Sequence, residues 1–400
     1  MTEKDNHNIE IYTLEWCPYC RKAKSFLKSK GFTYKEYDIG EDRIKNEMVK
    51  RTDGAKTVPQ IFIDEELIGG YDDLIERKKS GELDDILGID SEKNFRKNWD
   101  VIIVGAGPAG LSSALYTARK GLEVLIISSD LGGQMVDTGE VGNYLGMIDV
   151  TGPGLMEAFW NHIKEYEINL ELGETVADIE KNNEKSFTIA TESGYQVQTR
   201  AVIIASGTTN RELGVPGEKE FKGKGVHYCA TCDGFMYEGE PVAIIGGGNA
   251  GLEASLDLAQ LDCEVDLIEV QENLTGDQIL QDKVYASDSI NIYTGHGVDE
   301  IKGKEKVNSL VIKDIENDMS KELRVNGVFI EIGLLPNTEF IKEKVEVNDF
   351  NEILVNENNE TSIKGIWAAG DVTNIKDKQI IIAAGEGAKT ALRVNEYLKD

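Results

Sequence analysis

Basic residues and long apolar runs are both scarce in this sequence of 400 residues. Lys and Arg number 43 against 72 Asp and Glu, which gives a formal net charge of -29. Because nucleic acids and anionic membrane surfaces are bound by clusters of basic side chains, this excess of acid argues against either as a partner. An anionic cofactor would have to be held mainly by backbone N–H groups at helix N-termini.

The apolar runs are too short to cross a membrane. The longest, DVIIVGAG and VAIIGGG, fall far short of the roughly 20 residues that a spanning helix needs. The first residues, MTEKDNHNIEIY, contain no apolar core of a secretory signal. We therefore expect a cytoplasmic protein, and its length is enough for about two to four domains.

Cysteine is also rare, but its placement is informative. Four of the five cysteines form two Cys-x-x-Cys pairs, Cys17–Cys20 and Cys229–Cys232. In a reducing compartment such pairs are redox or metal sites. Zinc would need two further ligands at suitable spacing, and the 4 histidines of the chain offer no local pair, so we predict redox chemistry and no metal. Cys263, outside both pairs, is expected to be a small buried side chain.

The first part of the chain alternates strand and helix patterns. Strands are expected at IEIYTL, at FTYKEYDI and twice within PQIFIDEELIGG, and helices at residues 18–30, at DRIKNEMVKRT and at YDDLIERKKSGEL. Cys17 stands at the start of the first helix, followed by Lys22 and Lys24. A helix N-terminus and nearby cations lower the pKa of a thiol, which predicts a nucleophilic Cys17. Cys20, one turn inside the helix, is placed to resolve a mixed disulfide.

Two glycine-rich turns each follow an apolar strand and precede a helix. Both have the pattern G-x-G-x-x-G: Gly105, Gly107 and Gly110 in the first turn, and Gly246, Gly248 and Gly251 in the second. The first glycine permits a tight turn, the second lets a pyrophosphate approach the backbone, and the third lets the helix pack on the strand. The repeated pattern predicts two dinucleotide-binding Rossmann-like folds of the α/β class.

Glu269 stands at the end of the second strand after the second glycine turn. A carboxylate there accepts hydrogen bonds from a ribose 2′-OH and repels a 2′-phosphate. The neighbouring segment LIEVQENLTGD contains no Lys or Arg that could bind such a phosphate. Charge alone therefore favours NADH over NADPH. The alternative is that Glu269 is only a solvated carboxylate at a strand end.

With these motifs in view, the chain from about Trp99 to its C-terminus resembles the low-molecular-weight thioredoxin reductases and the reductase half of the alkyl hydroperoxide reductase flavoprotein. The matching segments are GAGPAG, GGQMVDT, ASG, CATCDGF, GGGNAG, IGLLPNT and AAGDV. Thioredoxin reductases usually carry a His-Arg-Arg cluster where this chain has Ile268, Glu269 and Val270, which agrees with the preference for NADH.

Residues 9 to about 85 resemble a glutaredoxin, through CPYC, TVPQIFID and GGYDDL. The hydroperoxide reductase flavoprotein has a longer N-terminal region built from a fused pair, and a single glutaredoxin-like domain takes its place here. The two resemblances together imply five segments: a thioredoxin-fold domain (1–88), a linker (89–98), an FAD domain in two parts (99–213 and 333–400) and an inserted nicotinamide-nucleotide domain (214–332).

The resemblance also implies roles for single residues. Cys232 would face the flavin and form the charge-transfer thiolate, Cys229 would be the exchange thiol, and Asp233 would donate and accept the proton. FAD would be held by Gly105, Ala106, Gly107, Pro108, Ala109, Gly133, Gln134, Asn143, Gly370, Asp371, Gln379 and Ile380. NADH would be held by Gly246, Gly248, Asn249, Gly251 and Glu269. At the position before Asn143 the family has an acidic residue, whereas this chain has Gly142.

In the glutaredoxin-like part the resemblance implies a cis-proline at Pro59, with Val58 offering its backbone to an extended substrate. Asp72 and Asp73 match the positions that hold the α-amino group of glutathione. The alternative for both carboxylates is that a helix N-terminus simply favours acidic residues.

The function that follows is a flavin-dependent NADH:disulfide oxidoreductase with a role in cell redox homeostasis. Electrons would pass from NADH through FAD to Cys229–Cys232, then to Cys17–Cys20, and then to a protein disulfide. A peroxiredoxin is the preferred acceptor, followed by a thioredoxin-like protein or glutathione. The alternatives are an NADPH- or ferredoxin-dependent enzyme, or a glutaredoxin domain that binds glutathione and an iron–sulfur cluster. The resemblance further implies a homodimer.

Overall fold

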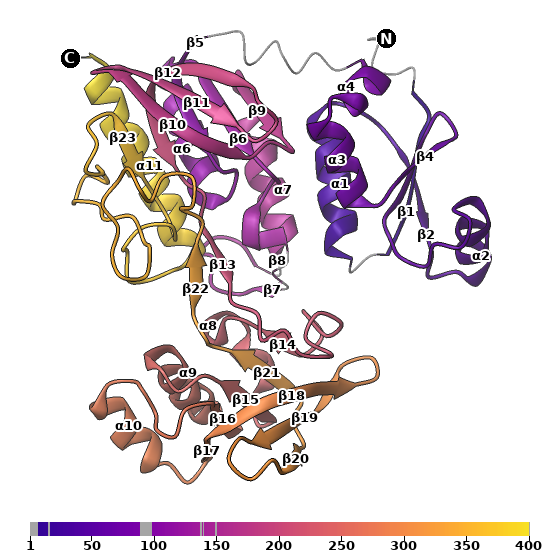
Figure 1. Cartoon of the computed structure of the whole chain (residues 1–400), viewed down its shortest axis with the longest axis vertical. Coiled ribbons are helices and arrows are strands. Elements are labelled where there is room, and N and C mark those ends of the chain that lie inside the picture. The colour runs from indigo at the N-terminus through magenta and orange to yellow at the C-terminus, as the bar shows by residue number, and fades with distance from the viewer. Residues whose placement is uncertain are drawn as a thin grey trace. The chain divides into compact units, whose positions relative to one another are not determined.

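The computed structural model describes residues 7–14, 17–88, 98–136, 138, 140–148 and 150–399 (Figure 1). It divides the chain into two compact units, which are described separately. Unit 1 comprises Met1–Asp137, Gly152–Thr208 and Pro336–Asp400, and unit 2 comprises Thr138–Thr151 and Thr209–Leu335. The predicted linker, 89–98, lies outside the described residues except for Asn98.

The N-terminal part of unit 1 is a four-stranded sheet with helices packed against it. The strand order is β2-β1-β3-β4, with β1 parallel to β2 and antiparallel to β3. The strands are β1 (Ile9–Thr13), β2 (Lys35–Asp38), β3 (Gln60–Ile63) and β4 (Glu66–Gly69), and the helices are α1 (Pro18–Ser29), α2 (Asp42–Arg51), α3 (Tyr71–Lys79) and α4 (Glu82–Leu87). In Figure 1, α1 and α3 lie side by side. This mixed sheet confirms the predicted thioredoxin-fold domain.

One predicted helix of this domain is two helices in the structure. The pattern YDDLIERKKSGEL predicts a single helix, whereas α3 ends at Lys79 and α4 begins at Glu82. Gly81, between them, has a φ of 83°, a left-handed conformation that glycine adopts at little cost. The chain therefore changes direction at Gly81.

The rest of unit 1 is a Rossmann-like layer structure around a seven-stranded sheet of order β10-β11-β12-β5-β6-β9, with β23 paired to β12. Its strands are β5 (Asn98–Val104), β6 (Val124–Ser128), β9 (Ile168–Leu172), β10 (Val176–Asn183), β11 (Ser186–Thr191), β12 (Gln196–Ile204) and β23 (Ile366–Ala368). Its helices are α6 (Pro108–Ala118), α7 (Gly152–Ile163), α11 (Ile380–Lys399) and the 3₁₀ turn η2 (Gly133–Val136).

The first glycine turn joins the central strand β5 to α6. Val101, Ile102 and Ile103 of β5 are fully buried, as expected for a parallel strand covered on both faces. α11, at the C-terminal end of the chain, packs against α6 (Figure 1). A Cβ on Gly387 of α11 would lie 2.1 Å from the carbonyl oxygen of Ala109, so the two helices approach closely. The C-terminal helix thus supports the start of α6.

Unit 2 contains a second Rossmann-like sheet, which confirms the predicted tandem arrangement. Its five described strands are parallel and have the order β14-β21-β15-β16-β17. They are β14 (Val226–His227), β15 (Pro241–Ile245), β16 (Glu264–Glu269), β17 (Ile290–Thr294) and β21 (Gly327–Ile330). The helices are α8 (Ala230–Asp233), α9 (Asn249–Gln260), α10 (Gln278–Tyr285) and the 3₁₀ turn η3 (Gly234–Tyr237).

Shorter strands complete unit 2. β18 (His296–Gly303), β19 (Val307–Asp314) and β20 (Ser320–Leu323) form an antiparallel sheet, and β7 (Glu140–Val141) pairs with β8 (Val150–Thr151). Two strands, β13 (Thr208–Asn210) and β22 (Leu334–Pro336), pair where the chain passes from one unit to the other and back. The described part of the chain has no helix long and apolar enough to span a bilayer.

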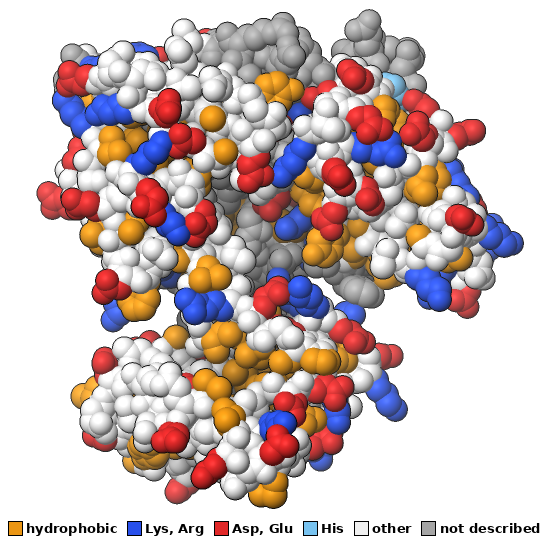
Figure 2. Space-filling view, in the orientation of Figure 1, with side chains coloured by type: hydrophobic (Ala, Val, Ile, Leu, Met, Phe, Trp, Pro, Cys, Tyr) orange, Lys and Arg blue, Asp and Glu red, His pale blue; other side chains and the backbone are white. Residues whose placement is uncertain are grey.

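The surface carries the acidic excess of the sequence in dispersed form. Figure 2 shows acidic side chains spread over the visible face, with lysines and arginines among them. Many of the carboxylates form ion pairs, as Glu184 does with Lys364 at 2.7 Å and Glu82 with Arg77 at 2.8 Å. Exposed pairs of this kind contribute about 0–1 kcal/mol each to stability, so the charge shapes solubility more than the fold.

Candidate redox and cofactor sites

The first Cys-x-x-Cys pair forms a disulfide at the N-terminus of α1. Cys17 is the N-cap residue, and its sulfur accepts the backbone N–H of Cys20 at 3.1 Å. Pro18 occupies the first helical position, where no N–H donor is needed. Both cysteines are buried. The predicted placement of the pair at a helix start is confirmed.

The loop before β3 approaches this disulfide. The Val58–Pro59 peptide bond is cis, as the resemblance implied. The carbonyl oxygen of Val58 lies 3.5 Å from the sulfur of Cys17. The backbone at Val58 is therefore next to the sulfur that a substrate would approach, and its role in binding that substrate remains a prediction.

The lysines that follow Cys17 are engaged elsewhere. Lys24 forms an ion pair with Glu36 at 2.8 Å, and Lys22 lies 3.4 Å from a carboxylate oxygen of Asp130. A carboxylate at that distance offsets much of the field that a lysine exerts on a thiol. The described contacts thus assign most of the positive potential at Cys17 to the N–H groups of α1, and less to lysines than the sequence suggested.

The two carboxylates of the GGYDDL segment differ in their surroundings. Asp73 accepts the backbone N–H of Gly70 at 2.7 Å and so caps the start of α3. Asp72 is exposed on the first turn of the same helix. The capping interpretation has a contact in the structure for Asp73, and glutathione binding by this pair remains a prediction.

The first glycine turn fits a pyrophosphate. Gly105 has a φ of 108°, and a Cβ there would lie 2.3 Å from the carbonyl oxygen of Ala205. A Cβ on Gly110 would lie 2.0 Å from the carbonyl oxygen of Gly105. At Gly107, by contrast, the nearest atom to such a Cβ is 3.9 Å away, and this residue is the N-cap of α6. An open space in front of helix N–H groups is what an anionic diphosphate requires.

Other predicted FAD residues of unit 1 lie around this turn. Ala106 donates its N–H to the Ser128 hydroxyl at 3.1 Å, and Gly133 donates to Asp130 at 2.9 Å. The side-chain amide of Gln134 donates to the hydroxyl of Thr208 at 2.7 Å. These contacts order η2 and the loop before it. Asn143 belongs to unit 2, in the loop after β7, and its place along a flavin remains a prediction.

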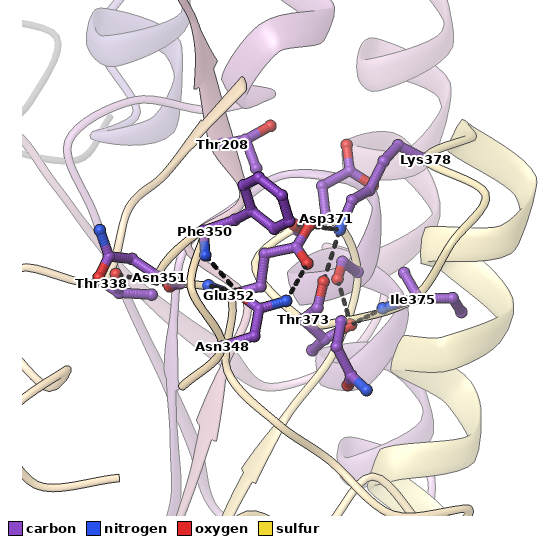
Figure 3. A network of polar contacts seen from close by, with 12 residues as sticks. Thr208, Thr338, Asn348, Phe350, Asn351, Glu352, Asp371, Thr373, Ile375 and Lys378 are labelled. Carbon is purple, nitrogen blue, oxygen red and sulfur yellow. Dashed lines mark hydrogen bonds and ion pairs between the residues drawn. The ribbon is translucent and has the colours of Figure 1, made fainter. Parts of the chain in front are cut away.

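The C-terminal FAD residues stand in a polar network that Figure 3 shows. Lys378 donates to the backbone oxygens of Asp371 at 3.0 Å and Thr373 at 2.5 Å, and its ammonium forms an ion pair with Glu352 at 2.8 Å. Burial raises the pKa of the Asp371 carboxyl to about 6, against the opposing effect of Lys378. Sequence reasoning missed Lys378, because nothing in TNIKDKQII distinguishes it from a surface lysine.

Gly370 and Gln379 shape the two ends of this segment. Gly370 has a φ of 77°, and a Cβ there would lie 2.9 Å from the Cβ of Ala109. The backbone oxygen of Gln379 accepts the N–H of Ala383, and Ile380 begins α11. The turn after β23 therefore lies beside the start of α6, where the first glycine motif is found.

The second glycine turn has the same construction in unit 2. Gly246 has a φ of 122°, and a Cβ on Gly251 would lie 1.8 Å from the carbonyl oxygen of Gly246. The nearest atom to a Cβ on Gly248 is the Thr275 hydroxyl at 3.8 Å. Asn249, the first residue of α9, accepts the N–H of Asp277 at 2.6 Å. The open space at Gly248 fits a second dinucleotide.

Glu269 is buried at the edge of this turn. Its carboxylate accepts the N–H of Gly247 at 2.6 Å and the N–H of Gln271 at 2.8 Å. Only 6% of the residue is exposed, so the interpretation of Glu269 as a solvated strand-end carboxylate is wrong. The carboxylate is fixed against the glycine turn, with its remaining lone pairs free to accept a ribose hydroxyl.

The second Cys-x-x-Cys pair lies between β14 and η3. Cys229 is disulfide-bonded and is the N-cap of α8, and the side chain of Cys232 lies outside the described residues. Asp233, at the end of α8, is 9% exposed. Its carboxylate lies 2.9 Å from Nδ1 of His227, whose Nε2 lies 2.7 Å from the hydroxyl of Tyr237.

A second acid reaches the same loop. Glu331, directly after β21, accepts the backbone N–H of Ala230 at 3.0 Å, next to Cys229. Burial raises the pKa of the Glu331 carboxyl to about 7, and the hydrogen bond from Ala230 opposes this. Sequence reasoning missed Glu331, His227 and Tyr237, because each is distant from the motif or looks like an ordinary strand residue.

Cys263 behaves as predicted. It is a free thiol, 1% exposed, in the core between α9 and β16. Burial raises the pKa of its thiol, which makes it unreactive. The described residues contain no group of three or more His, Cys, Asp and Glu side chains arranged around a metal position.

Family models match both halves of this architecture. The model described as pyridine nucleotide-disulphide oxidoreductase matches residues 99–391, and the model described as glutaredoxin matches residues 9–68. The chain belongs to the pyridine nucleotide-disulphide oxidoreductase family and carries a glutaredoxin domain ahead of the reductase. It is a flavin-dependent disulfide reductase fused to a glutaredoxin-like domain.

Curated relatives and solved structures agree with this assignment. The alkyl hydroperoxide reductase flavoprotein of Pseudomonas aeruginosa is 39% identical over 86% of this chain and 66% of its own length, and that of Pseudomonas putida is 39% identical over 98% and 76%. Thioredoxin reductase from Streptococcus pyogenes has a TM-score of 0.72 at 32% identity, over 76% of this chain and 98% of its own. Thioredoxin reductase from Giardia duodenalis has the same TM-score at 31% identity, over 76% of this chain and 100% of its own.

Proposed function

We propose that this enzyme passes electrons from NADH through FAD to a Cys229–Cys232 disulfide, then to Cys17–Cys20, and from there to a disulfide of another protein. The observation that carries the proposal is the oxidised Cys229 beside the buried carboxyl of Asp233 in the nucleotide-binding unit. A disulfide needs a proton when it is opened, and a buried acid at its side can supply it. Cys17–Cys20, a second oxidised pair at a helix N-terminus, then serves as the outlet.

The residues of unit 1 fit FAD as a bound group. The open N-terminus of α6 at Gly107 would hold the pyrophosphate, and the turn at Gly370 and Asp371 would hold the ribityl end. When bound, FAD supplies hydride acceptance from the nicotinamide and two-electron transfer to a disulfide. Lys378 keeps the Asp371 turn in place through the backbone contacts seen in Figure 3.

NADH is the favoured donor because of Glu269. Its fixed carboxylate can accept a ribose 2′-OH, whereas a 2′-phosphate would meet a buried negative charge. The segment 268–276 contains no Lys or Arg that could compensate. We therefore infer NADH as the donor, with NADPH the weaker alternative.

A peroxiredoxin is the acceptor that best matches the relatives, since these are named as components of alkyl hydroperoxide reductase. A thioredoxin-like protein and glutathione are the other acceptors that a Cys-Pro-Tyr-Cys pair can reduce. The Cys17 sulfur beside the Val58 carbonyl suits an extended protein segment, because backbone pairing at a cis-proline loop binds without regard to side chains. We infer a homodimer, as the resemblance implies.

The test is an anaerobic mapping of thiols. The parent and a Cys229→Ser variant are mixed with NADH or NADPH, quenched with a thiol-alkylating label, and analysed by peptide mass. We expect NADH to release labelled Cys17 and Cys20 in the parent but not in the variant. Reduction of the flavin without any labelled cysteine in the parent would contradict the whole path. Labelled Cys17 in the variant would show that Cys229 is bypassed.

A further inference from the structure

Asp233 is one end of a buried chain of three side chains in unit 2. Its carboxylate meets Nδ1 of His227, and Nε2 of His227 meets the hydroxyl of Tyr237. Asp233 and His227 are 9% and 8% exposed, whereas Tyr237 is partly open to solvent. The chain therefore leads from the carboxyl behind the redox disulfide toward the surface.

The neighbours of His227 hold its ring in one orientation. α8 presents Asp233, η3 presents Tyr237, and β21 presents the ring of Phe329, which stacks on the imidazole at 5.2 Å. Burial, together with the charge of Asp233, raises the pKa of Tyr237 to about 12. The phenol thus keeps its proton at neutral pH and donates it to Nε2, which leaves Nδ1–H to donate to Asp233.

The other oxygen of the Asp233 carboxyl has no such contact. Oδ1 is buried and has no hydrogen-bond partner among the residues that the structure describes. An unpaired buried carboxylate oxygen is costly, so a donor is expected to reach it at another stage of the cycle. A thiol formed when the neighbouring disulfide opens is such a donor.

We propose that His227 is a positioning residue that holds Asp233 and relays solvent protons to it through Tyr237, so that the disulfide at Cys229 can open and close in every turnover. This inference rests on the proposed function, because it requires the Cys229 disulfide to be the one that NADH reduces. It adds two residues, His227 and Tyr237, to a site for which the sequence pointed to Asp233 alone.

The proton balance shows why a relay is needed. Two electrons break the S–S bond, and one sulfur becomes a thiol with the proton of Asp233 while the other stays a thiolate. When this pair reduces an acceptor, its S–S bond forms again and the two acceptor sulfurs gain two electrons and two protons. NADH supplies the electron pair and one proton, and the solvent supplies the second proton. That second proton is the one that passes from Tyr237 to His227 and then to Asp233.

The test compares His227→Phe with a matched variant, His296→Phe. His296 lies in the same unit, packs edge-on against Tyr293 at 5.8 Å and binds only a backbone oxygen among its described contacts. Because general acid–base steps contribute about 10²–10⁴-fold, we expect His227→Phe to slow NADH-dependent disulfide reduction at least tenfold at pH 8, with partial rescue by added imidazole. His296→Phe is expected to stay within twofold of the parent, without an imidazole response.

Two further measurements separate relay from support of the fold. His227→Gln can still donate an N–H to Asp233 but cannot carry a proton, so a slow, imidazole-rescued Gln variant supports the relay and a fully active one overturns it. The second is the pH profile of alkylation of reduced Cys229, in a chain with Cys17→Ser and Cys20→Ser. The profile is expected to shift in His227→Phe and to stay in place in His296→Phe; an unshifted His227→Phe profile speaks against contact between the relay and the thiol.

The outcome also distinguishes this inference from the proposed function. If NADH releases no Cys229 thiol in the parent, the proposed function fails whatever the histidine variants do. If the parent is reduced through Cys229 and His227→Phe has the same rate, the same pH profile and no imidazole response, only the relay is overturned.

Discussion

The two Cys-x-x-Cys sites differ in what lies behind the sulfur. At Cys17 the described contacts are backbone groups, the N–H of Cys20 and the carbonyl of Val58. At Cys229 the neighbourhood is built from buried side chains that titrate or relay, namely Asp233, His227 and Glu331. α1 has 12 residues and α8 only 4, so the helix dipole is a stronger influence at the first site.

This difference matches two chemical tasks. A thiolate stabilised by fixed backbone dipoles is ready to attack and needs no proton exchange. A disulfide that is opened by electrons from a nucleotide has to take up and release protons in each turnover, and fixed dipoles cannot do that. The contrast leads to four predictions, ordered from the largest expected effect to the smallest.

Cys229→Ser should have the largest effect. We expect NADH-dependent reduction of any disulfide acceptor to fall at least about 10³-fold, because loss of a covalent nucleophile removes the step altogether. Reduction of the flavin by NADH should be unaffected in stopped-flow absorbance. Cys263→Ser is the control, since that thiol is buried and outside both pairs; an equal loss in the control would point to damage of unit 2.

Cys17→Ser should separate the two sites. The variant is expected to lose about 10²-fold or more in the reduction of a protein disulfide, since the outgoing nucleophile is gone. NADH-driven opening of the Cys229 disulfide should remain within twofold of the parent. Cys20→Ser is the matched variant, expected to accumulate a mixed disulfide between Cys17 and the acceptor. Full acceptor reduction by Cys17→Ser would mean that Cys229 reaches acceptors directly.

Glu331→Gln tests the acidic side of the comparison through stability. The pKa of Glu331 is raised to about 7 in the folded protein from an ordinary value of 4.5, so the folded state holds a proton that the unfolded state releases between these values. Stability contributed by this group is therefore full below pH 4.5 and falls as pH rises to about 7. The loss is on the order of 3 kcal/mol.

We expect Glu331→Gln to unfold about 5–10 °C above the parent at pH 8 and within a degree or two of it at pH 5, by calorimetry. The amide oxygen can still accept the Ala230 N–H, so the loop should keep its shape. Glu305→Gln, an exposed carboxylate of the same unit, serves as the control and should show no pH-dependent difference. Equal melting of Glu331→Gln and parent at pH 8 would show that this carboxyl is ionised at little cost.

Lys24→Ala should have the smallest effect. Lys24 is paired with Glu36 at a partly exposed position, and such pairs contribute about 0–1 kcal/mol. The alkylation rate of reduced Cys17 at neutral pH should therefore change by less than about threefold. A tenfold slowing would return the lysines to the role that the sequence suggested and weaken the contrast between the sites.

Much of the fold could be predicted from local sequence signals. Gly105 and Gly246 follow apolar strands and precede helices, and in the structure a Cβ at either position would collide with backbone. The start of α1 at Pro18 and the cis bond at Pro59 were likewise predicted. The split at Gly81 was not, because one glycine inside an otherwise helical pattern is a weak signal.

The sequence by itself determined the tandem Rossmann-like folds, the thioredoxin-fold domain and the identity of both cysteine pairs. These depend on short-range rules, since periodicity, turn glycines and cysteine spacing act within one element or between neighbours. Only the tertiary structure decided that Glu269 is buried and fixed, and that His227 and Glu331 stand behind Cys229. Strands β14 and β21 are about a hundred residues apart in the chain yet adjacent in one sheet, and no local pattern reports which side chains such a pairing brings together.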